Sequence, residues 1–429
     1  MRDDDLSDSR ARCAVEDEPV AQNPTWFSTR LITPPFLAVT AVTGLFFVYV
    51  GIQIPLIPRL IEDRLGGTEL DIGLNLAVFS LSAIAIRPFL GAWGDRYGRR
   101  TLMIGGAFLA GIGALVAGYV TSRWMLLPLR AMSGIGEGAL FVGAATMISD
   151  LAPAHRRAEA ASYFSVAVFG GIGIGPILGE TLAAGDDFRR GLVVASLCAF
   201  GAAALAFIVP KGIGVRDPAV SAAPRPGDAV SNRFHRAAIR PGATLAFGMA
   251  GFATFNAFMP EHARNVGLSG SKWVFATYSV VCLVVRIVGA KVPERIGLTR
   301  AVTTALLFLS SGLAVLSGVA SPVGVFLGAA LIGIGMSFLY PALMALTVNA
   351  VPEHERARVI STFTMFFEVG SASGGLAFGF VANLTSKRGG FLAGAISAMV
   401  GLWFLWRVLL PHVRLRPIPA SETAVSPAH

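Results

Sequence analysis

The chain has 429 residues, of which 54% are hydrophobic and only 14% are charged. This composition excludes a soluble two-domain protein and is typical of an integral membrane protein. The formal net charge of +9 does not indicate a nucleic-acid partner, because the basic residues separate apolar segments instead of gathering on one soluble face. The three cysteines, Cys13, Cys198 and Cys282, lie far apart in the sequence, and we expect no metal site from them.

Residues 1–34 are polar, carry acidic clusters and lack the apolar core of a secretory signal, so they are predicted to form a disordered cytoplasmic tail. Beyond them, apolar segments recur with the length of about twenty residues that a helix needs to cross about 30 Å of hydrocarbon. The predicted spans are 35–57, 70–93, 101–120, 124–147, 160–183, 191–210, 241–260, 271–292, 301–320, 323–348, 357–382 and 389–410. Their continuous hydrophobicity, without a two-residue period, excludes a transmembrane β-barrel. The predicted fold is an all-α membrane protein with twelve transmembrane helices.

Lysine and arginine positions set the predicted orientation, because these residues accumulate in cytoplasmic loops. With the amino terminus in the cytoplasm, the inner loops and tails hold 23 of the 35 basic residues, and the outer loops hold nine. We therefore expect a multi-pass protein of the cell (inner) membrane with both termini in the cytoplasm.

An internal repeat divides the twelve spans into two halves. Residues between positions 87 and 164 recur 199 positions later without a gap: Arg87 matches Arg286, Asp95 matches Glu294, Arg96 matches Arg295, Gly98 matches Gly297, and Gly134 matches Gly333. We expect two pseudo-symmetric six-helix bundles, over 35–210 and 241–410. The hydrophilic stretch 211–240 is predicted to be a cytoplasmic linker, with an ordered regulatory element as the alternative, and 411–429 a cytoplasmic tail.

Between the second and third spans lies the stretch Gly91–Arg100, which contains three glycines, one aspartate and three arginines. Its charges are too costly for hydrocarbon, so it is predicted to form a tight turn at the membrane surface. Twelve spans with this stretch in this place resemble the major facilitator superfamily. The resemblance implies that the stretch clamps the cytoplasmic ends of the two bundles in the outward-facing state. The gating residues expected here are Gly91, Asp95, Arg96, Gly98 and Arg99, with Arg87 contributing to the inner gate; for Arg99 and Arg100 the alternative is a role in topology alone.

Two further motifs fit the resemblance. The fourth span contains Arg130–Gly136, similar to the RxxxGxG motif of the superfamily, and the fifth resembles the GxxxGPxxGG motif of its antiporters, although a glutamate, Glu180, stands at the final glycine. Within the fifth span, Gly171, Gly175 and Gly179 lie on one helical stripe beside Pro176. We expect this stripe to be the surface on which the bundles rock, with plain helix packing as the alternative.

Six side chains inside the predicted spans are ionisable. Because a charge in hydrocarbon is costly, we expect each of them to have a polar partner or a function. They are Arg87, Arg130, Glu137, Glu180, Arg286 and Glu368. Arg130 and Glu137 are two helical turns apart on one face, so they can meet directly or through one water. Burial disfavours an ionised carboxylate and a nearby arginine favours it, so opening and closing a water path can load and unload a proton.

We hypothesise that Glu137 exchanges a proton while Arg130 modulates its affinity, with a static salt bridge as the alternative. Glu368 is either a second protonation site or an interfacial polar contact. Arg87 and Arg286 are expected to have mainly structural roles near the cytoplasmic ends of their spans, and Glu180 to reach the headgroups or the external mouth.

As the resemblance implies, spans one, four, seven and ten should line a central cavity. The candidate substrate contacts on these and neighbouring spans are Gln53, Asn75, Tyr163, Phe255, Asn256, Phe338 and Tyr340. The rest of this wall is mostly apolar, which suits a hydrophobic or amphipathic solute better than a sugar or a polyanion.

The sequence thus predicts a proton-coupled antiporter that exports drugs or amphipathic metabolites and uses the proton gradient without a cofactor. The resemblance to the superfamily further implies a monomer. Two alternatives stay open, an importer of a small organic acid bound by Arg130 and a lipid or lysolipid carrier. We expect no enzymatic activity, because the chain shows no nucleotide-binding loop, no metal constellation and no nucleophile with a base.

Overall fold

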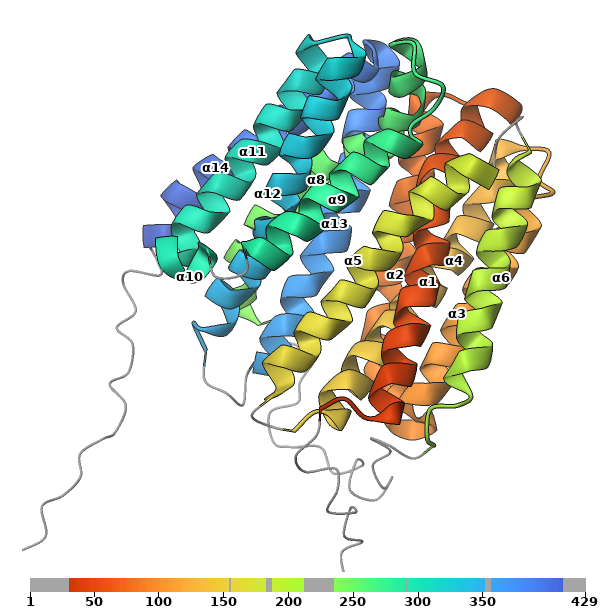
Figure 1. Ribbon diagram of the computed structural model, residues 1–429, viewed down its shortest axis with the longest axis vertical. Helices are drawn as coiled ribbons and strands as arrows, with labels where there is room; N and C mark the ends of the chain where they lie inside the picture. The colour runs from red at the N-terminus through yellow and green to blue at the C-terminus, as the bar shows by residue number, and fades with distance from the viewer. Residues whose placement is uncertain are drawn as a thin grey trace, which may run out of the picture.

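The computed structural model describes residues 31–153, 156–182, 187–211, 235–289, 292–351 and 356–411, which form helices joined by short loops (Figure 1). The first half contains α1 (Pro34–Arg59) with the π-helical turn η2 (Leu60–Arg64), α2 (Glu69–Tyr97), α3 (Arg99–Ala117), α4 (Arg123–Leu151), α5 (Arg157–Leu182) and α6 (Phe188–Ala206). The second half contains α8 (Arg236–Asn265), α9 (Lys272–Val288), the short α10 (Val292–Ile296), α11 (Leu298–Gly318), α12 (Pro322–Val348), α13 (Arg356–Leu384) and α14 (Lys387–Phe404) with the π-helical turn η6 (Leu405–Leu409).

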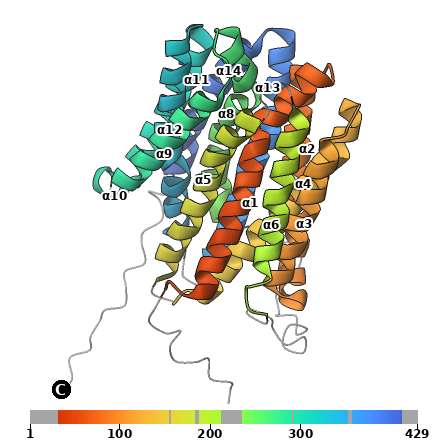
Figure 2. The same cartoon turned by 45° about the vertical axis from the view of Figure 1, so that its right-hand side comes forward.

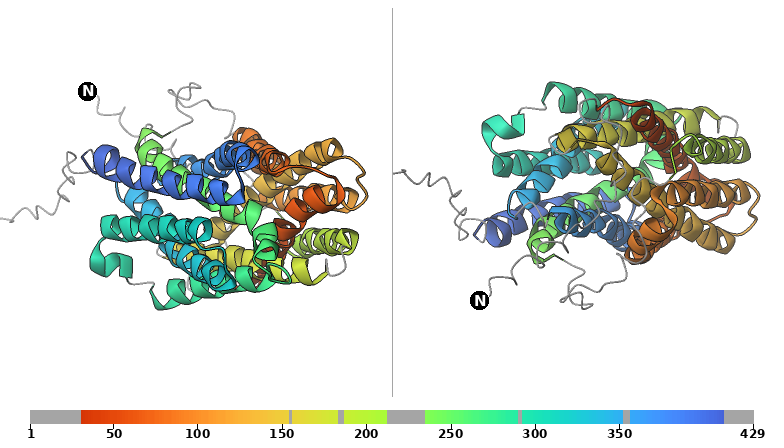
Figure 3. Two further views of the ribbon diagram at one scale, coloured as in Figure 1. Left: turned by 90° about the horizontal axis from the view of Figure 1, so that it is seen from above. Right: turned by 90° about the horizontal axis from the view of Figure 1, so that it is seen from below.

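The helices form two bundles that follow the order of the chain. In the first, α1 packs against α5, α6 and α4, and α3 packs against α4 and α6; in the second, α8 packs against α13, α14 and α12, and α11 packs against α12 and α14. Seen along the helices, the two groups lie side by side (Figure 3). They meet where α2 packs on α13, α5 on α9, and α1 on α8, and Figure 2 shows α5 between α1 and α9. The predicted all-α fold with two six-helix bundles is confirmed.

The lengths of the helices match a membrane crossing. Eleven helices of the described residues are long and apolar enough to span a bilayer. The twelfth, α9, has 17 residues, which at 1.5 Å per residue extends over about 26 Å. It coincides with the predicted eighth span, so the structure contains a helix for each predicted span.

Serine and threonine caps start several of these helices. Thr33 accepts a hydrogen bond from the backbone N–H of Phe36, and Pro34 follows it at the first helical position. Ser321 and Pro322 repeat this arrangement at the start of α12. Such caps satisfy N–H groups that have no partner within the helix, and proline there gives up no hydrogen bond.

The internal repeat is visible in individual contacts. Gly98 and Gly297 both have φ of 87°, a region that residues with a Cβ rarely adopt. A Cβ on Gly134 of α4 would lie 2.1 Å from the carbonyl oxygen of Phe79, and a Cβ on Gly333 of α12 would lie 2.8 Å from that of Tyr278. Phe79 and Tyr278 are themselves 199 positions apart, so the two halves repeat their helix contacts as well as their sequence.

The stretch after the second span differs from the prediction. Instead of a tight turn over Gly91–Arg100, α2 continues to Tyr97, α3 starts at Arg99, and Gly98 alone separates them. One residue with positive φ is sufficient to turn the chain, so most of the charged motif is helical. Likewise α8 starts at Arg236, inside the predicted linker. Residues 1–30, 212–234 and 412–429 lie outside the described residues, and their predicted roles stay predictions.

Candidate functional site

Two acidic side chains from different bundles lie in the interior within range of each other's charge. Glu137 on α4 and Glu368 on α13 are both 6% exposed, and the charge of Glu368 acts directly on Glu137. Arg87 on α2 is the positive charge that acts on both. The Oε2 atom of Glu137 has no hydrogen-bond partner among the described residues. The three side chains form a mixed-charge group between the bundles, which we call the central triad.

Arg87 connects the bundles directly. Its Nη1 atom donates a hydrogen bond of 3.0 Å to the hydroxyl oxygen of Thr364, one turn before Glu368 on α13. The guanidinium also lies over the ring of Phe141, 5.8 Å from its centre. Arg87 therefore belongs to the central triad, and its expected contribution to an inner gate stays a prediction.

Arg130 is placed differently from the prediction. Its Nη1 atom donates a hydrogen bond of 3.0 Å to Oε1 of Gln53 on α1, and its guanidinium lies 4.6 Å from the centre of the Phe79 ring. An ion pair with Glu137 is absent among the contacts of the described residues. The spacing of seven residues allowed the two side chains to meet, but the guanidinium instead contacts Gln53 of α1 and Phe79 of α2.

Arg286 is the counterpart of Arg87 in the second half. Its guanidinium lies 4.0 Å from the centre of the Phe169 ring, which belongs to α5 of the other bundle. Its Nε and Nη2 atoms are buried without a hydrogen-bond partner. Tyr278 and Tyr340 are close enough to affect its charge. Arg286 is thus a cation at the bundle interface, opposite an aromatic ring.

Two of the candidate substrate contacts lie near these arginines. Tyr340 is partly buried, packs against Phe363, and is influenced by both Arg87 and Arg286. Phe338 is partly buried and lies beside Gly289 on α9. Both therefore remain candidates.

Three candidates lie elsewhere. Phe255 is fully buried in an aromatic cluster with Phe252, Phe275 and Tyr278, so it is a packing residue and does not face an open cavity in this conformation. Asn75 is buried, and its Nδ2 atom donates to the backbone oxygen of Asp71 on its own helix.

Tyr163 is 41% exposed at the start of α5 and packs edge-on against Phe36, away from the central triad. Asn256 on α8 is partly buried, and no contact of its side chain settles its role. Gln53 is buried and holds Arg130.

The glycine stripe of α5 packs inside one bundle. A Cβ on Gly171 would lie 2.7 Å from the backbone oxygen of Gly44, and a Cβ on Gly175 would lie 2.4 Å from the Cα of Gly51, both on α1. Gly179 approaches Ile52 of α1 in the same way, and Pro176 also faces this contact. The partner of this stripe belongs to the same bundle, which favours the alternative of plain helix packing; that the bundles rock on the stripe stays a prediction.

A different glycine pair lies between the bundles. A Cβ on Gly73 of α2 would lie 2.0 Å from the carbonyl oxygen of Gly375 on α13, and a Cβ on Gly379 would lie 3.2 Å from the Cα of Gly73. Sequence reasoning did not select this pair, although the run Gly374–Gly375 with Gly379 one turn later was a visible signal of close helix contact.

The charged motif makes its described contacts within the first bundle. Arg99 pairs with Asp150 of α4 at 3.3 Å, and Arg100 lies over the ring of Phe207. Arg96 lies over the ring of its neighbour Tyr97. Gly91 and Asp95 belong to α2, but the surroundings of these two residues lie outside what the structure describes, so the predicted role of Asp95 in a gate stays a prediction.

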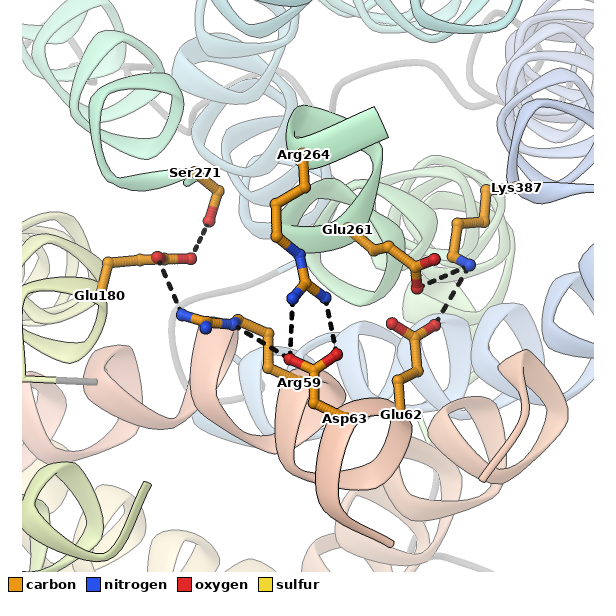
Figure 4. A network of polar contacts seen from close by, with 8 residues as sticks. All are labelled: Arg59, Glu62, Asp63, Glu180, Glu261, Arg264, Ser271 and Lys387. Atoms are coloured by element: carbon orange, nitrogen blue, oxygen red, sulfur yellow. Dashed lines mark hydrogen bonds and ion pairs between the residues drawn. The ribbon is translucent and has the colours of Figure 1, made fainter. Parts of the chain in front are cut away.

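A network of ion pairs joins the bundles at the face that is predicted to be outer (Figure 4). We call this network the outer latch; it consists of Arg59, Glu62, Asp63, Glu180, Glu261, Arg264, Ser271 and Lys387. Arg264 of α8 donates two hydrogen bonds to Asp63, of 2.8 and 3.0 Å. Lys387 of α14 pairs with Glu62 at 3.3 Å and also with Glu69 at 2.9 Å.

The remaining contacts of the outer latch involve Glu180. Arg59 pairs with it at 3.3 Å within the first bundle, and the hydroxyl of Ser271, just before α9, donates to it across the interface. Glu180 was expected to reach headgroups or the external mouth; it lies in this network at the predicted outer face, where it is buried. The ion pairs that link the two bundles in the described part of the chain all lie at this face.

Comparison with known proteins identifies the family. The model of the Major Facilitator Superfamily matches residues 39–271 and 242–429. The chain belongs to the major facilitator superfamily. It is therefore a multi-pass membrane transporter with a small-molecule substrate.

Relatives within the superfamily are similar over nearly their whole length. An uncharacterized MFS-type transporter of Salmonella typhimurium is 26% identical over 382 residues, covering 87% of this chain and 96% of the relative. An uncharacterized MFS-type transporter of Burkholderia mallei is 26% identical over 386 residues, covering 86% and 91%.

Solved superfamily structures share the fold at lower identity. A bacterial homologue of the human lysosomal transporter Spinster, in an inward-facing and unoccupied conformation, has a TM-score of 0.71 at 16% identity, covering 92% of this chain and all of that one. A variant of the nucleoside transporter NupG has a TM-score of 0.70 at 14% identity, covering 87% and 99%. These similarities support the superfamily fold alone.

Proposed function

We propose that this superfamily member is a proton-coupled antiporter that exports hydrophobic or amphipathic small molecules by alternating access. The observation that carries the proposal is the central triad, in which Glu137 and Glu368 belong to different bundles and share one arginine, Arg87. Coupling requires a proton site whose surroundings change when the bundles move, and a site divided between the bundles meets that requirement.

The charges of the central triad favour one bound proton. Two ionised carboxylates near each other repel, and a single arginine can neutralise only one of them. When Glu137 and Glu368 are close, as in this conformation, one of them is best protonated. When the bundles separate around them, the repulsion falls and water can reach the acids, so the proton can leave. Movement and proton exchange are then linked.

The outer latch supplies the conformational part of the cycle. In the proposed orientation, with both termini in the cytoplasm, the ion pairs of Arg264 and Lys387 close the outer face. Opening outward must break them, and the helical motif around Asp95 and Arg96 would then draw the inner ends together. Among the described residues, the contacts of Arg96 with Tyr97 and of Arg99 with Asp150 lie within the first bundle.

Export of amphipathic solutes is supported by two features of the fifth span and the interior. The GxxxGPxxG part of the antiporter motif is present in α5, and most side chains of the spans expected to line the interior are apolar or aromatic, which suits an apolar solute. We further propose that the protein acts as a monomer in the inner membrane and needs no cofactor besides the proton gradient.

Proteoliposomes with an imposed pH gradient test this proposal. We would assay ethidium, dansylamide and dansylate as cationic, neutral and anionic amphipathic solutes, and follow proton movement with an entrapped pH-sensitive dye. Antiport requires that solute movement in one direction drives protons in the other, and that Glu137→Gln abolishes this exchange. Solute flux that is unaffected by the gradient, or full coupling in Glu137→Gln, would rule the mechanism out.

A further inference from the structure

The internal repeat brings two equivalent arginines to the bundle interface with unequal partners. Arg87 of α2 reaches α13, where Thr364 accepts its hydrogen bond and Glu368 supplies a negative charge. Arg286 of α9, 199 positions later, reaches α5 of the other bundle. The residue of α5 that corresponds to Glu368 is Phe169, so the second arginine faces a ring where the first faces an acid.

The guanidinium of Arg286 has no acceptor in the described part of the chain. No hydrogen bond or ion pair of this side chain is formed with a described residue, and its Nε and Nη2 atoms are buried without a partner. The ionisable groups that act on it are Cys282, Tyr278 and Tyr340, none of which is an anion at neutral pH. A cation within a membrane-spanning bundle that lacks a counter-charge is costly, and such residues typically mark ligand or ion pathways.

The guanidinium groups of the other two interior arginines each donate to an acceptor within the protein. Arg130 donates to Gln53, and Arg87 donates to Thr364 and has the two carboxylates of the central triad nearby. Arg286 is therefore the interior arginine best able to accept an anion from outside the chain. Its contact with Phe169 uses no N–H donor in a hydrogen bond, and the Nε and Nη2 atoms remain without an acceptor.

We propose that Arg286 binds the negatively charged group of the transported solute, so that the solutes are amphipathic organic monoanions such as carboxylates and sulfonates. The proposal rests on the transport function proposed above and names its substrate class. A guanidinium can form two parallel hydrogen bonds with such a group. The apolar part of the solute would lie against Phe169 and against Phe338 and Tyr340 of α12, which surround the same part of the interface.

The position of Arg286 also explains why the anion would matter for transport. Arg286 belongs to α9 and the Phe169 ring that it contacts belongs to α5, so a solute bound there touches both bundles. Neutralising the buried charge would favour the closed interface around the solute, whereas the empty interface carries an uncompensated cation.

Binding to the detergent-solubilised full-length protein, without any pH gradient, tests this inference. Dansylate and dansylamide share one ring system and differ in the sulfonate charge, so their affinities measured by fluorescence titration isolate the contribution of the anion. We expect wild-type protein to bind dansylate at least about tenfold more tightly than dansylamide, as expected for one charge-assisted contact. Arg286→Gln should remove this preference by weakening dansylate alone, and Arg286→Lys should retain part of it.

Two controls separate binding from folding. Arg190→Gln alters an arginine on the predicted outer surface, whose side chain is 78% exposed, and should leave the preference for dansylate unchanged. Because Arg286 has no hydrogen-bond or ion-pair partner in the described chain, and its buried charge costs more than its contact with Phe169 returns, Arg286→Gln should melt at the same temperature as wild type or higher. A lowered melting temperature together with an unchanged preference would identify a structural cation and overturn the inference.

The inference and the proposed function can fail separately. If wild-type protein does not prefer dansylate, including the case in which neither probe binds, the inference fails whatever the proton-coupling assay gives. If the preference depends on Arg286 but Glu137→Gln keeps full coupling, the anion site stands and the proton mechanism fails.

Discussion

The guanidinium of Arg264 on α8 donates two parallel hydrogen bonds to the carboxylate of Asp63, although the two residues are 201 positions apart in the chain. They belong to different bundles, so the pair can exist only while the outer face is closed. A bidentate arginine–carboxylate pair is geometrically demanding. It therefore reports the relative position of the bundles more directly than any single apolar contact.

Reversing one charge of this pair should open the outer face. In Asp63→Arg, two arginines would face each other, and we expect the ratio of closed to open molecules to fall by about fivefold or more, the equivalent of about 1 kcal/mol. Spin labels on the exposed loops, at Arg64→Cys and Ser269→Cys in a background without the native cysteines, would measure this as a longer distance.

The matched control restores the attraction with exchanged partners. Asp63→Arg combined with Arg264→Asp should return the distance distribution towards that of wild type. If the single charge reversal leaves the distances unchanged, the outer latch does not hold the bundles together.

The contact between Gly73 and Gly375 gives a second prediction. Any side chain at Gly73 would overlap the backbone of α13, because a Cβ would lie 2.0 Å from the carbonyl oxygen of Gly375. We expect Gly73→Val to hold α2 and α13 apart, to lengthen the same spin-label distance and to reduce transport by at least about tenfold, since the cycle could no longer close its outer face.

Gly105→Val is the control for this substitution. Gly105 also lies within a helix, but a Cβ there would have nothing within 4 Å. Its transport rate should stay close to that of wild type. Normal transport in Gly73→Val would mean that α2 and α13 need not approach so closely.

Glu368 should contribute to coupling from the second bundle. We expect Glu368→Gln to reduce proton-driven accumulation of solute severely while leaving movement down a solute gradient, because the amide can form hydrogen bonds but cannot carry a proton. Vesicle assays with and without a pH gradient would measure the two modes. The control is Asp187→Asn, at an exposed ion pair of the loop before α6, which should change neither transport mode. Equal losses in both modes for Glu368→Gln would instead indicate a structural role of Glu368.

Removal of Arg87 should make stability depend more strongly on pH. In Arg87→Met the two carboxylates of the central triad lose their shared positive charge, and the penalty appears when both are ionised. The melting temperature should therefore fall further below that of wild type as the pH rises. Combining Arg87→Met with Glu368→Gln should reduce this pH-dependent fall in melting temperature, because the second substitution removes one of the two negative charges. A fall that is the same at every pH would mean that Arg87 stabilises the protein only through its hydrogen bond with Thr364.

The turn glycines of the repeat give a prediction about stability. Gly98 and Gly297 have φ of 87° with ψ of 149° and 143°, a backbone region that is almost restricted to glycine. Gly297→Ala should lower the free energy of unfolding by about 1–3 kcal/mol. Gly105→Ala, inside a helix and in open space, should be neutral or slightly stabilising. Thermal melts in one detergent would compare them, and equal stability of the two variants would contradict the assignment.

The positions of the helices could be predicted because each depends on a local property. A continuous apolar segment must satisfy its backbone within a helix wherever it lies in the bilayer, so the span around Glu137 required no knowledge of its neighbours. The match of Arg87 with Arg286 likewise required only a constant offset. The boundaries were less accurate: Gly91, Asp95 and Arg96 proved to be helical, since a single glycine at position 98 is enough to turn the chain.

The sequence by itself determined that this protein is a twelve-span transporter-like membrane protein with two equivalent halves, and that its interior carries a few charges that need partners. Only the tertiary structure decided which partners they have. Arg130 selects Gln53, 77 positions away, over Glu137 on its own helix, and the stripe around Gly175 packs on α1 within its bundle. Helical spacing tells which residues share a face, but the direction of that face depends on how all the helices pack, and packing is fixed by long-range contacts that no local pattern contains.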